Sequence, residues 1–293
     1  LKSGLKLNLA SNRLSKLVVL FYFVVGVLAA IPFMDHHSVI NAIFIDGFGV
    51  QKERSYTRPL EGLQNDQVGF HLLGTDINGN DVLLQTAQGA STAMLLAFGV
   101  AAVSFPLGIF LGLWAGYAGG WVDEAIQWFY TTVASIPWIL FVVTFLVIFG
   151  RGIIWVVIAI GLTSWVDLAR LVRGEALRLR EQSFIKSAKA VGMPVYSILF
   201  KEILPNTMPI IRINFALSAS SVILAETVLT FIGIGIEPGT SSWGAMISEA
   251  QRELMRDPMI WWNFFSATVI GIFPLVMALN LIADEPTEDR RKV

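Results

Sequence analysis

The chain has 293 residues and a formal net charge of −1; 55% of its residues are hydrophobic and only 15% are charged. Because soluble domains average about 25% charged residues, this composition argues against an ordinary soluble enzyme. The lack of a basic excess argues against a nucleic-acid binder, and the absence of cysteine excludes a disulfide scaffold, thiolate metal sites and a cysteine nucleophile. A mean hydropathy of +0.65 indicates that most of the chain lies in a membrane.

Apolar runs predict the membrane-crossing segments. A helix that spans the bilayer needs roughly 20 mostly apolar residues, and we expect an all-α membrane protein with about six such helices. In chain order they are predicted over residues 17–34, about 90–117, about 125–149, 153–166 with Asp167 and its neighbours as an extension, 210–236 and 261–283. Pro106, Pro137 and Pro274 fall inside three of these segments. They predict kinks in a packed bundle, since neighbouring helices satisfy the carbonyls that a proline frees.

The distribution of lysine and arginine predicts the orientation. Residues 1–16 carry four basic residues and no acidic one. If this tail is cytoplasmic, most of the other lysines and arginines also fall on the cytoplasmic side, in agreement with the positive-inside rule. We therefore expect a multi-pass protein of a bacterial or archaeal cytoplasmic (inner) membrane, with the tails 1–16 and 285–293 in the cytoplasm.

Two long polar segments, 35–88 and 237–260, are then expected outside. In the first, Asp76 and Asp81 either attract a docking partner or cap turns around Gly74 and Gly79. Three histidines are expected to be solvated rather than to bind a metal: His36, His37 and His71.

The second outside segment contains a short amphipathic helix, predicted over residues 247–255. Trp243, Trp261 and Trp262 lie close to it in the sequence, and tryptophans at that depth usually anchor at the membrane interface. We therefore expect these three indoles at the interface.

The loop between the fourth and fifth predicted spans, residues 167–206, is too long for a simple connector. It begins with an amphipathic helix over 167–180, in which Asp167 is expected to pair with Arg170. Ser183 is predicted to cap a helix over 184–191, which Gly192 ends. A second short helix is predicted over 196–204 and ends at Pro205. Periodicity alone leaves open a basic, solvated loop held by lipid headgroups.

The spacing within this loop resembles the "EAA" loop of the permease subunits of ATP-binding-cassette (ABC) importers, which reads E-A-A, three residues, G, nine residues, I-x-L-P. The residues that carry the resemblance are Lys186, Ser187, Ala188, Ala190, Gly192, Ile203, Leu204 and Pro205. Lys186 stands where the family has glutamate, Ser187 replaces the first alanine, and Ile203 is one place late.

Three further segments resemble the same family, the binding-protein-dependent permeases for dipeptides, oligopeptides and nickel. Residues 72–81 are similar to its L-G-T-D-x-x-G-R-D, residues 225–235 to A-E-x-x-L-S-F-L-G-L-G, and Pro238 with 242–244 to P…S-W-G. Four motifs in order, from residue 72 to the sixth span, resemble the second-type permease of such systems. Asn80 departs from the arginine of the first motif, and the family's C-terminal G-D-x-L-R-D-x-L-D-P pattern is absent.

The resemblance implies a type I ABC importer permease fold. Residues 17–34 would be the first transmembrane helix and 35–88 an external loop. Residues 89–284 would be a five-helix core that includes the cytoplasmic coupling loop 167–206 and the external segment 237–260. Glu226, within the fifth span, is either a functional pore residue or a hydrogen-bonded carboxylate that braces the bundle, and Gly233 and Gly235 follow it in the same motif.

The implied function is half of an ATP-driven translocation pore for di- or oligopeptides, without covalent chemistry in this chain. No G-x-x-x-x-G-K-[ST] sequence occurs, so we expect no cofactor or metal here, and ATP and Mg²⁺ on separate ATPase subunits. The implied partners are a second homologous permease, one or two kinds of ATPase, an extracytoplasmic substrate-binding protein and membrane lipid.

Nickel, a metal–chelator complex or another small solute is the alternative cargo. A stand-alone secondary carrier is the alternative class, although such carriers usually show internal repeats and paired intramembrane charges. A membrane hydrolase is not supported, since the chain lacks H-E-x-x-H, G-x-S-x-G and an aspartate pair within its spans.

Overall fold

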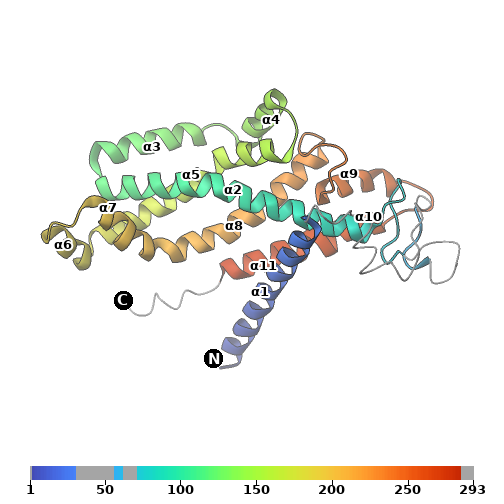
Figure 1. The fold of residues 1–293 in the computed structure, drawn as a ribbon, viewed down its shortest axis with the longest axis horizontal. Coiled ribbons are helices and arrows are strands. Elements are labelled where there is room, and N and C mark those ends of the chain that lie inside the picture. The colour runs from blue at the N-terminus through green and yellow to red at the C-terminus, as the bar shows by residue number, and fades with distance from the viewer. Residues whose placement is uncertain (1, 31–55, 62–70, 285–293) are drawn as a thin grey trace. The chain divides into compact units, whose positions relative to one another are not determined.

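A computed structural model describes residues 2–30, 56–61 and 71–284. Within these ranges every regular element is helical (Figure 1). In chain order the elements are α1 (Lys2–Ala30), α2 (Val82–Ala118), α3 (Gly120–Ala134), α4 (Trp138–Phe149), α5 (Ile153–Arg180), α6 (Ser183–Ala190), α7 (Val195–Ser197), the π-helix η3 (Ile198–Ile203), α8 (Leu204–Phe231), α9 (Trp243–Glu253), α10 (Trp262–Phe265), the π-helix η4 (Ser266–Ile272) and α11 (Phe273–Ala283).

The chain divides into two compact units. Unit 1 comprises residues 1–96, 151–153 and 223–279, and unit 2 comprises residues 97–150, 154–222 and 280–293. Unit 1 therefore holds α1, α9 and the first part of α2, whereas unit 2 holds α3, α4, α6 and most of α5.

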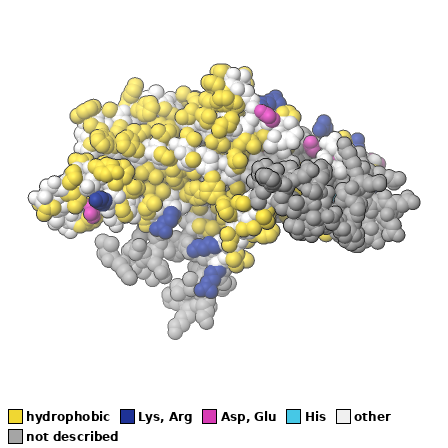
Figure 2. All heavy atoms as spheres, in the orientation of Figure 1, with side chains coloured by type: hydrophobic (Ala, Val, Ile, Leu, Met, Phe, Trp, Pro, Cys, Tyr) yellow, Lys and Arg dark blue, Asp and Glu magenta, His cyan; other side chains and the backbone are white. Residues whose placement is uncertain are grey.

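Among the described residues, four helical segments are long and apolar enough to cross a membrane: α2, α5, Val195–Phe231 and Trp262–Ala283. The bent pair α3 and α4 is a fifth if the two helices together count as one broken span. The sixth predicted span, 17–34, falls on α1 as far as Ala30, and its last four residues lie outside the described residues. Apolar side chains along α1 such as Leu17 and Phe21 are exposed, as on a lipid-facing helix. Figure 2 shows hydrophobic side chains over much of the visible face of the helices.

The prediction of one kinked helix over 125–149 is wrong. α3 ends at Ala134, α4 begins at Trp138, and the two helices are bent by 73°. Pro137 causes the break, because it has an extended backbone (φ −56°, ψ 119°) directly before α4, and the residue before a proline is itself disfavoured in a helix.

The boundary predicted at residue 167 is also wrong. α5 runs without a break from Ile153 to Arg180 and joins the fourth span to the amphipathic helix. No proline interrupts this stretch, and one buried face continues through it from Val156 to Leu179. The first helix of the predicted coupling loop is therefore the end of a helix long and apolar enough to cross the membrane.

Pro205 does not end a helix, because η3 runs directly into α8 and the helical segment continues over Val195–Phe231. α8 starts at Leu204 and continues to Phe231, so the fifth span begins six residues before and ends five residues before its predicted bounds. Pro205 directly follows the π-helix η3, whose hydrogen bonding already departs from the regular i→i−4 pattern that a proline interrupts. α2 likewise begins at Val82, before its predicted start, because Asp81 caps it by accepting from Leu84 N at 3.0 Å. The tail 1–16 is helical from Lys2 onward and continuous with α1.

Candidate functional site

The candidate coupling loop is built on α6 in unit 2. Ile185 and Ala188 are buried in a hydrophobic core that also contains residues of α2, α5 and η3. Lys186, Ser187 and Ala190 are exposed on the other face of α6. Ser183 was predicted to be the cap of this helix, but it is the first helical residue, and Gln182 at the cap position makes no side-chain cap bond. A short helix with one buried stripe therefore presents its opposite face outward.

Gly192 ends α6 as predicted. Its φ of +76° is a left-handed conformation that favours glycine. Its N–H donates to Lys189 O, and Met193 N–H donates to Ala188 O, both at 3.0 Å, which is the Schellman pattern of a helix end. A Cβ at this position would meet no atom of the chain within 4 Å. The turn itself, rather than a close approach within the chain, thus requires glycine.

The second helix of the loop, predicted over 196–204, is instead α7 followed by η3, which runs directly into α8. Ile203 is fully buried and packs in the same core as α6. Leu204 is partly buried against it, and Pro205 is exposed in the first turn of α8. The predicted coupling residues therefore fall into two groups: Ala188, Ile203 and Leu204 hold the loop on unit 2, and the remainder face outward.

Sequence reasoning missed the apolar part of the exposed face. Val191 is 80% exposed and Tyr196 is 68% exposed, and Phe184 and Val195 are exposed beside them in the chain. Large exposed apolar side chains of this kind are typical of a surface that contacts another protein or a membrane. The signal was present in the sequence, since these residues stand where a solvated basic loop would carry polar ones. We call these four residues the α6–α7 apolar face.

Lys186, at the position of the family's glutamate, forms an exposed ion pair with Glu181: its Nζ lies 3.4 Å from Glu181 Oε2. The hydrogen bond from Lys186 holds the pKa of the Glu181 carboxyl below its ordinary value. An acidic side chain thus sits next to position 186 even though the residue itself is basic.

Cationic side chains fasten the loop to the end of α2. Lys189 Nζ lies 4.6 Å from the centre of the Tyr117 ring. Arg180 Nη1 donates to the carbonyls of Gly116 and Tyr117, each at 3.4 Å, where the carbonyl end of a helix attracts positive charge. A Cβ at Gly119 would lie 2.8 Å from this nitrogen. The arginine at the end of α5 therefore sits against the last turn of α2.

A bidentate ion pair joins α5 to α3. Arg173 Nε and Nη2 donate to the two carboxylate oxygens of Asp123 at 2.6 and 2.7 Å, and both side chains are largely shielded from solvent. One turn earlier, Arg170 lies over the Tyr130 ring at 5.2 Å. The predicted Asp167–Arg170 pair is also present, at 3.8 Å, but Asp167 is exposed.

A stripe of glycines brings α2 and α5 into backbone contact. A Cβ at Gly108, Gly112 or Gly116 would lie 2.6–2.8 Å from atoms of α5, among them carbonyl oxygens of its backbone. Glycine at every fourth position is the pattern that lets membrane helices approach closely. The sequence contained this stripe, but nothing in it indicated which helix would fill it.

The possible pore residues lie in unit 1 at the end of α8. Glu226 is buried, and its Oε1 accepts from Thr230 Oγ1 at 2.8 Å. Gly233 has a φ of +85° and ends α8 through Ile234 N–H to Leu229 O and its own N–H to Thr230 O. A Cβ at Gly235 would lie 2.3 Å from Thr230 Oγ1. These contacts favour the bracing interpretation of Glu226, while a pore-lining role for the three residues stays a prediction.

In the predicted outside segment 35–88, the described acids cap turns. Asp76 is buried, and its Oδ1 accepts from the N–H groups of Asn78 and Asn80 at 2.8 Å. The prediction that His71 is solvated is wrong. Its side chain is buried, and its Nδ1 lies 2.7 Å from Asp81 Oδ2. His36 and His37 lie outside the described residues. Among the described residues no group of three or more acids and histidines has the geometry of a metal site.

Two of the three tryptophans expected at the membrane interface are buried instead. Trp243 and Trp262 donate through Nε1 to Thr86 O and Thr75 O, both at 3.0 Å. Trp261 alone is substantially exposed. An indole that finds a carbonyl partner inside a packed unit loses little by leaving the interface. The predicted helix 247–255 is α9, which starts at Trp243 because Ser242 caps it by accepting from Ala245 N.

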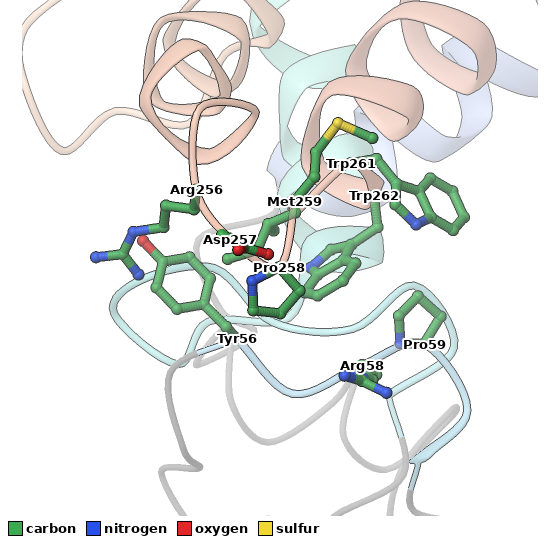
Figure 3. A pocket seen from close by; sticks show the side chains of 10 residues that line it. Tyr56, Arg58, Pro59, Arg256, Asp257, Pro258, Met259, Trp261 and Trp262 are labelled. Atoms are coloured by element: carbon green, nitrogen blue, oxygen red, sulfur yellow. The ribbon is translucent and has the colours of Figure 1, made fainter.

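Unit 1 also has a cavity of about 720 Å³ on the segment that follows α9. Figure 3 shows the Arg256 guanidinium beside the Tyr56 ring, where its Cζ lies 4.7 Å from the ring centre. Trp261, Trp262 and Arg58 complete an aromatic and basic lining.

The fold and the loop define a class: a multi-pass helical membrane protein with a short, anchored helix that presents an apolar face. Residues 108–284 match the family described as "Binding-protein-dependent transport system inner membrane component". The chain belongs to this family and is an inner-membrane permease subunit of the ABC importer type.

Curated relatives agree with this assignment. The chain is 33% identical over 216 residues to the oligopeptide transport system permease protein OppC of Haemophilus influenzae, which covers 74% of this chain and 68% of the relative. It is 30% identical over 281 residues to the dipeptide transport system permease protein DppC of Bacillus subtilis, covering 94% and 81%. It is 33% identical over 214 residues to the glutathione transport system permease protein GsiD of Pectobacterium atrosepticum, covering 73% and 70%.

A solved structure shares the fold. An inward-facing conformation of the MetNI methionine ABC transporter superposes with a TM-score of 0.51 at 16% identity, covering 69% of this chain and 94% of that chain. The predicted type I ABC importer permease fold is therefore confirmed.

Proposed function

We propose that this chain forms half of the translocation pore of an ATP-driven importer of di- or oligopeptides. The relatives reported above are named for oligopeptides, dipeptides and glutathione, which favours a peptide over the alternative cargo, nickel or another small solute. The partners would be a second homologous permease, one or two kinds of ATPase and an extracytoplasmic substrate-binding protein. Both termini and α6 would lie in the cytoplasm, and α9 outside.

In this proposal the chain itself is not catalytic. Without a Walker A sequence, ATP and Mg²⁺ would be bound by the ATPase subunits. The chain would contribute a contact through which the closure of those subunits moves its spans. The observation that carries the proposal is the α6–α7 apolar face, exposed on a loop whose other face is buried in the core of unit 2.

Contacts within unit 2 supply a route for that motion. The ATPase would press on α6, which packs against α5 and whose Lys189 lies over the Tyr117 ring at the end of α2. Arg180, at the end of α5, binds the same turn of α2. α2 and α5 are in backbone contact along the glycine stripe. Because close-packed interiors are nearly incompressible, a displacement of α6 would move these helices together rather than deform the loop.

Purification of the tagged chain from its native membrane, followed by mass spectrometry, tests the proposal. We expect a second permease and one or two ATPases. Val191→Glu and Tyr196→Asp should each release the ATPases, because a charge in an apolar contact is left without a partner. Met255→Glu is the matched control, since Met255 is 82% exposed in the segment assigned to the outside, and it should leave the complex intact. Purification of the chain without any ATPase, with transport driven by an ion gradient, would instead indicate a secondary carrier.

A further inference from the structure

Residues 241–244, Ser-Ser-Trp-Gly, form the entry to α9 and contact all the long helices of unit 1. They meet α1 at Tyr22, α2 at its first turns, α8 at Thr227 and the π-helix η4 at Gly271. α9 itself is not among the segments long and apolar enough to span a membrane. A short surface helix is thus attached to four membrane helices through its first residues.

Trp243 is the centre of this attachment and is only 1% exposed. Its Nε1 donates to Thr86 O. A Cβ at Gly89 would lie 2.5 Å from the indole ring, and a Cβ at Gly271 would lie 2.7 Å from it. The indole therefore occupies a slot whose two walls have to be glycine; we call it the Trp243 slot.

Neutral hydrogen bonds hold the backbone before the indole, at Ser241, and a close backbone approach holds it after the indole, at Gly244. Ser241 Oγ donates to Gln88 Oε1 at 2.6 Å, and Thr92 Oγ1 donates to Ser241 O at 2.8 Å. On the other side, a Cβ at Gly244 would lie 2.9 Å from Thr227 O. Loss of the indole contact alone therefore leaves α9 attached but free to shift.

One wall of the slot belongs to an irregular helix. Gly271 lies in η4, and π-helical turns frequently occur at functional positions. The Tyr22 hydroxyl donates to Ile270 O, the carbonyl four residues before Pro274, which that proline cannot satisfy. The Tyr22 ring also meets the indole edge-on, with centroids 6.1 Å apart. Trp243 thus touches a segment in which the helical pitch already departs from the regular one.

The far end of α9 is exposed. Arg252, Met255 and Arg256 are accessible to solvent, and Met259 follows them on the exposed segment. α9 therefore has a base fixed in the Trp243 slot and one buried face that ends at Glu253, and its exposed tip, Arg252 with residues 255–259 after the helix, is available for contact.

We propose that Trp243 is a positioning residue that fixes the base of α9 to α1, α2 and η4, so that a load on the exposed tip of α9 is passed to the membrane helices. This inference rests on the proposed function, in which α9 is outside and the load is applied by the docked substrate-binding protein. Without the indole in its slot, the protein still docks but no longer stimulates the ATPase through this chain.

The test is Trp243→Phe in the complete transporter, reconstituted in lipid vesicles with its ATPases and its binding protein. Phenylalanine keeps a ring in the slot and loses the hydrogen bond to Thr86. We expect assembly and basal ATP hydrolysis to be retained, and the stimulation of hydrolysis by the loaded binding protein to fall about tenfold, the size typical of one lost buried hydrogen bond. Trp121→Phe is the matched control: it changes an indole that is 78% exposed on α3 and should leave the stimulation unchanged.

A second variant changes the wall of the Trp243 slot that η4 supplies. Gly271→Ala places a methyl group against the indole, and it should reduce the stimulation like Trp243→Phe. Gly174→Ala is its control, since a Cβ there meets nothing within 4 Å. Amide hydrogen exchange of residues 243–253 should rise in both slot variants and in neither control.

The outcomes separate the two proposals. Wild-type stimulation in either slot variant, with faster exchange in α9, would overturn the positioning role. If Trp243→Phe does not assemble, Gly271→Ala alone is the test. Wild-type stimulation in this variant, with faster exchange in α9, would overturn the positioning role. A wild-type complex that lacks ATPases would instead overturn the proposed function.

Discussion

Two short helices are attached to the long helices of this permease, and they are attached by different physics. In unit 2, α6 is held by a hydrophobic core and by the cationic contact of Lys189 with Tyr117 at the end of α2. In unit 1, α9 is held by an indole in a glycine-walled slot and by neutral hydrogen bonds. Charged contacts near water weaken with salt, whereas the Trp243 slot depends on shape. The comparison indicates that added salt weakens part of the attachment of α6 and leaves the contacts of the Trp243 slot unchanged.

The largest expected effect comes from filling the glycine stripe under α6. Gly116→Val would bring a branched side chain against Arg173 O and Ala176 Cβ, each 2.6 Å from the position of the new Cβ. Both helices must then separate, and we expect a loss of about 3 kcal/mol in the free energy of unfolding, at the upper end of the cost of overpacking, because the obstacle includes backbone. Thermal unfolding in detergent measures it, with Gly174→Ala as the unobstructed glycine control. An unchanged Tm would show that α2 and α5 are not in backbone contact.

Removal of the α3–α5 ion pair tests the charged attachment. Asp123→Asn and Arg173→Gln should each lower stability, and their double-mutant cycle should give a coupling energy of about 1–3 kcal/mol, as for contacting partners in a shielded network. The same cycle in 1 M salt should shrink only modestly, because the pair is largely shielded. The exposed Asp167–Arg170 pair is the reference, with a coupling below about 0.5 kcal/mol. Equal coupling energies in the two pairs would contradict the expectation that the shielded Asp123–Arg173 pair is stronger than the exposed Asp167–Arg170 pair.

The attachment of α9 should depend on pH through a buried acid at its end. Burial raises the pKa of Glu253 above its ordinary value of 4.5, and the amide of Asn263 offsets only part of this. Neither carboxylate oxygen has a hydrogen-bond partner of normal geometry among the described residues. The folded state therefore keeps the proton to higher pH than the unfolded state, so stability falls as the pH rises from 4.5 through the raised pKa.

Glu253→Gln removes this ionisation. It should flatten the pH dependence of unfolding and raise the free energy of unfolding at pH 7.5 by about 1 kcal/mol. Glu249→Gln is the comparison, since burial and then Asp76 raise the pKa of Glu249 as well. Thermal unfolding between pH 4 and pH 8 measures both variants. A wild-type protein that becomes more stable over the upper part of this range would contradict the assignment.

The smallest effect is expected at the exposed pair beside the α6–α7 apolar face. Lys186→Ala removes the hydrogen bond that lowers the pKa of Glu181, but both side chains are well exposed. The Tm should change by no more than about 1 °C, because exposed ion pairs contribute little. A larger change would indicate that Lys186 takes part in holding α6.

The sequence was sufficient for the family, for the end of α6 at Gly192 and for the approximate positions of the spans. Each of these depends on local information: apolar runs, a glycine that must adopt a positive φ, and a motif with fixed spacing. The same local information misplaced the break in the third span and the ends of α5 and α8. A proline in a helical pattern does not always end the helix, and at Pro205 the π-helix η3 runs directly into α8.

Only the tertiary structure decided what the glycines and tryptophans are for. Gly108, Gly112 and Gly116 read as ordinary residues of an apolar helix until α5 lies against them. Trp243 reads as an interface anchor until its indole meets a carbonyl 157 positions earlier in the chain. A sequence pattern indicates the periodicity and the turn residues of one segment. A slot such as the one around Trp243 forms only where segments distant in the sequence pack together, so their contact decides which side chain fits it.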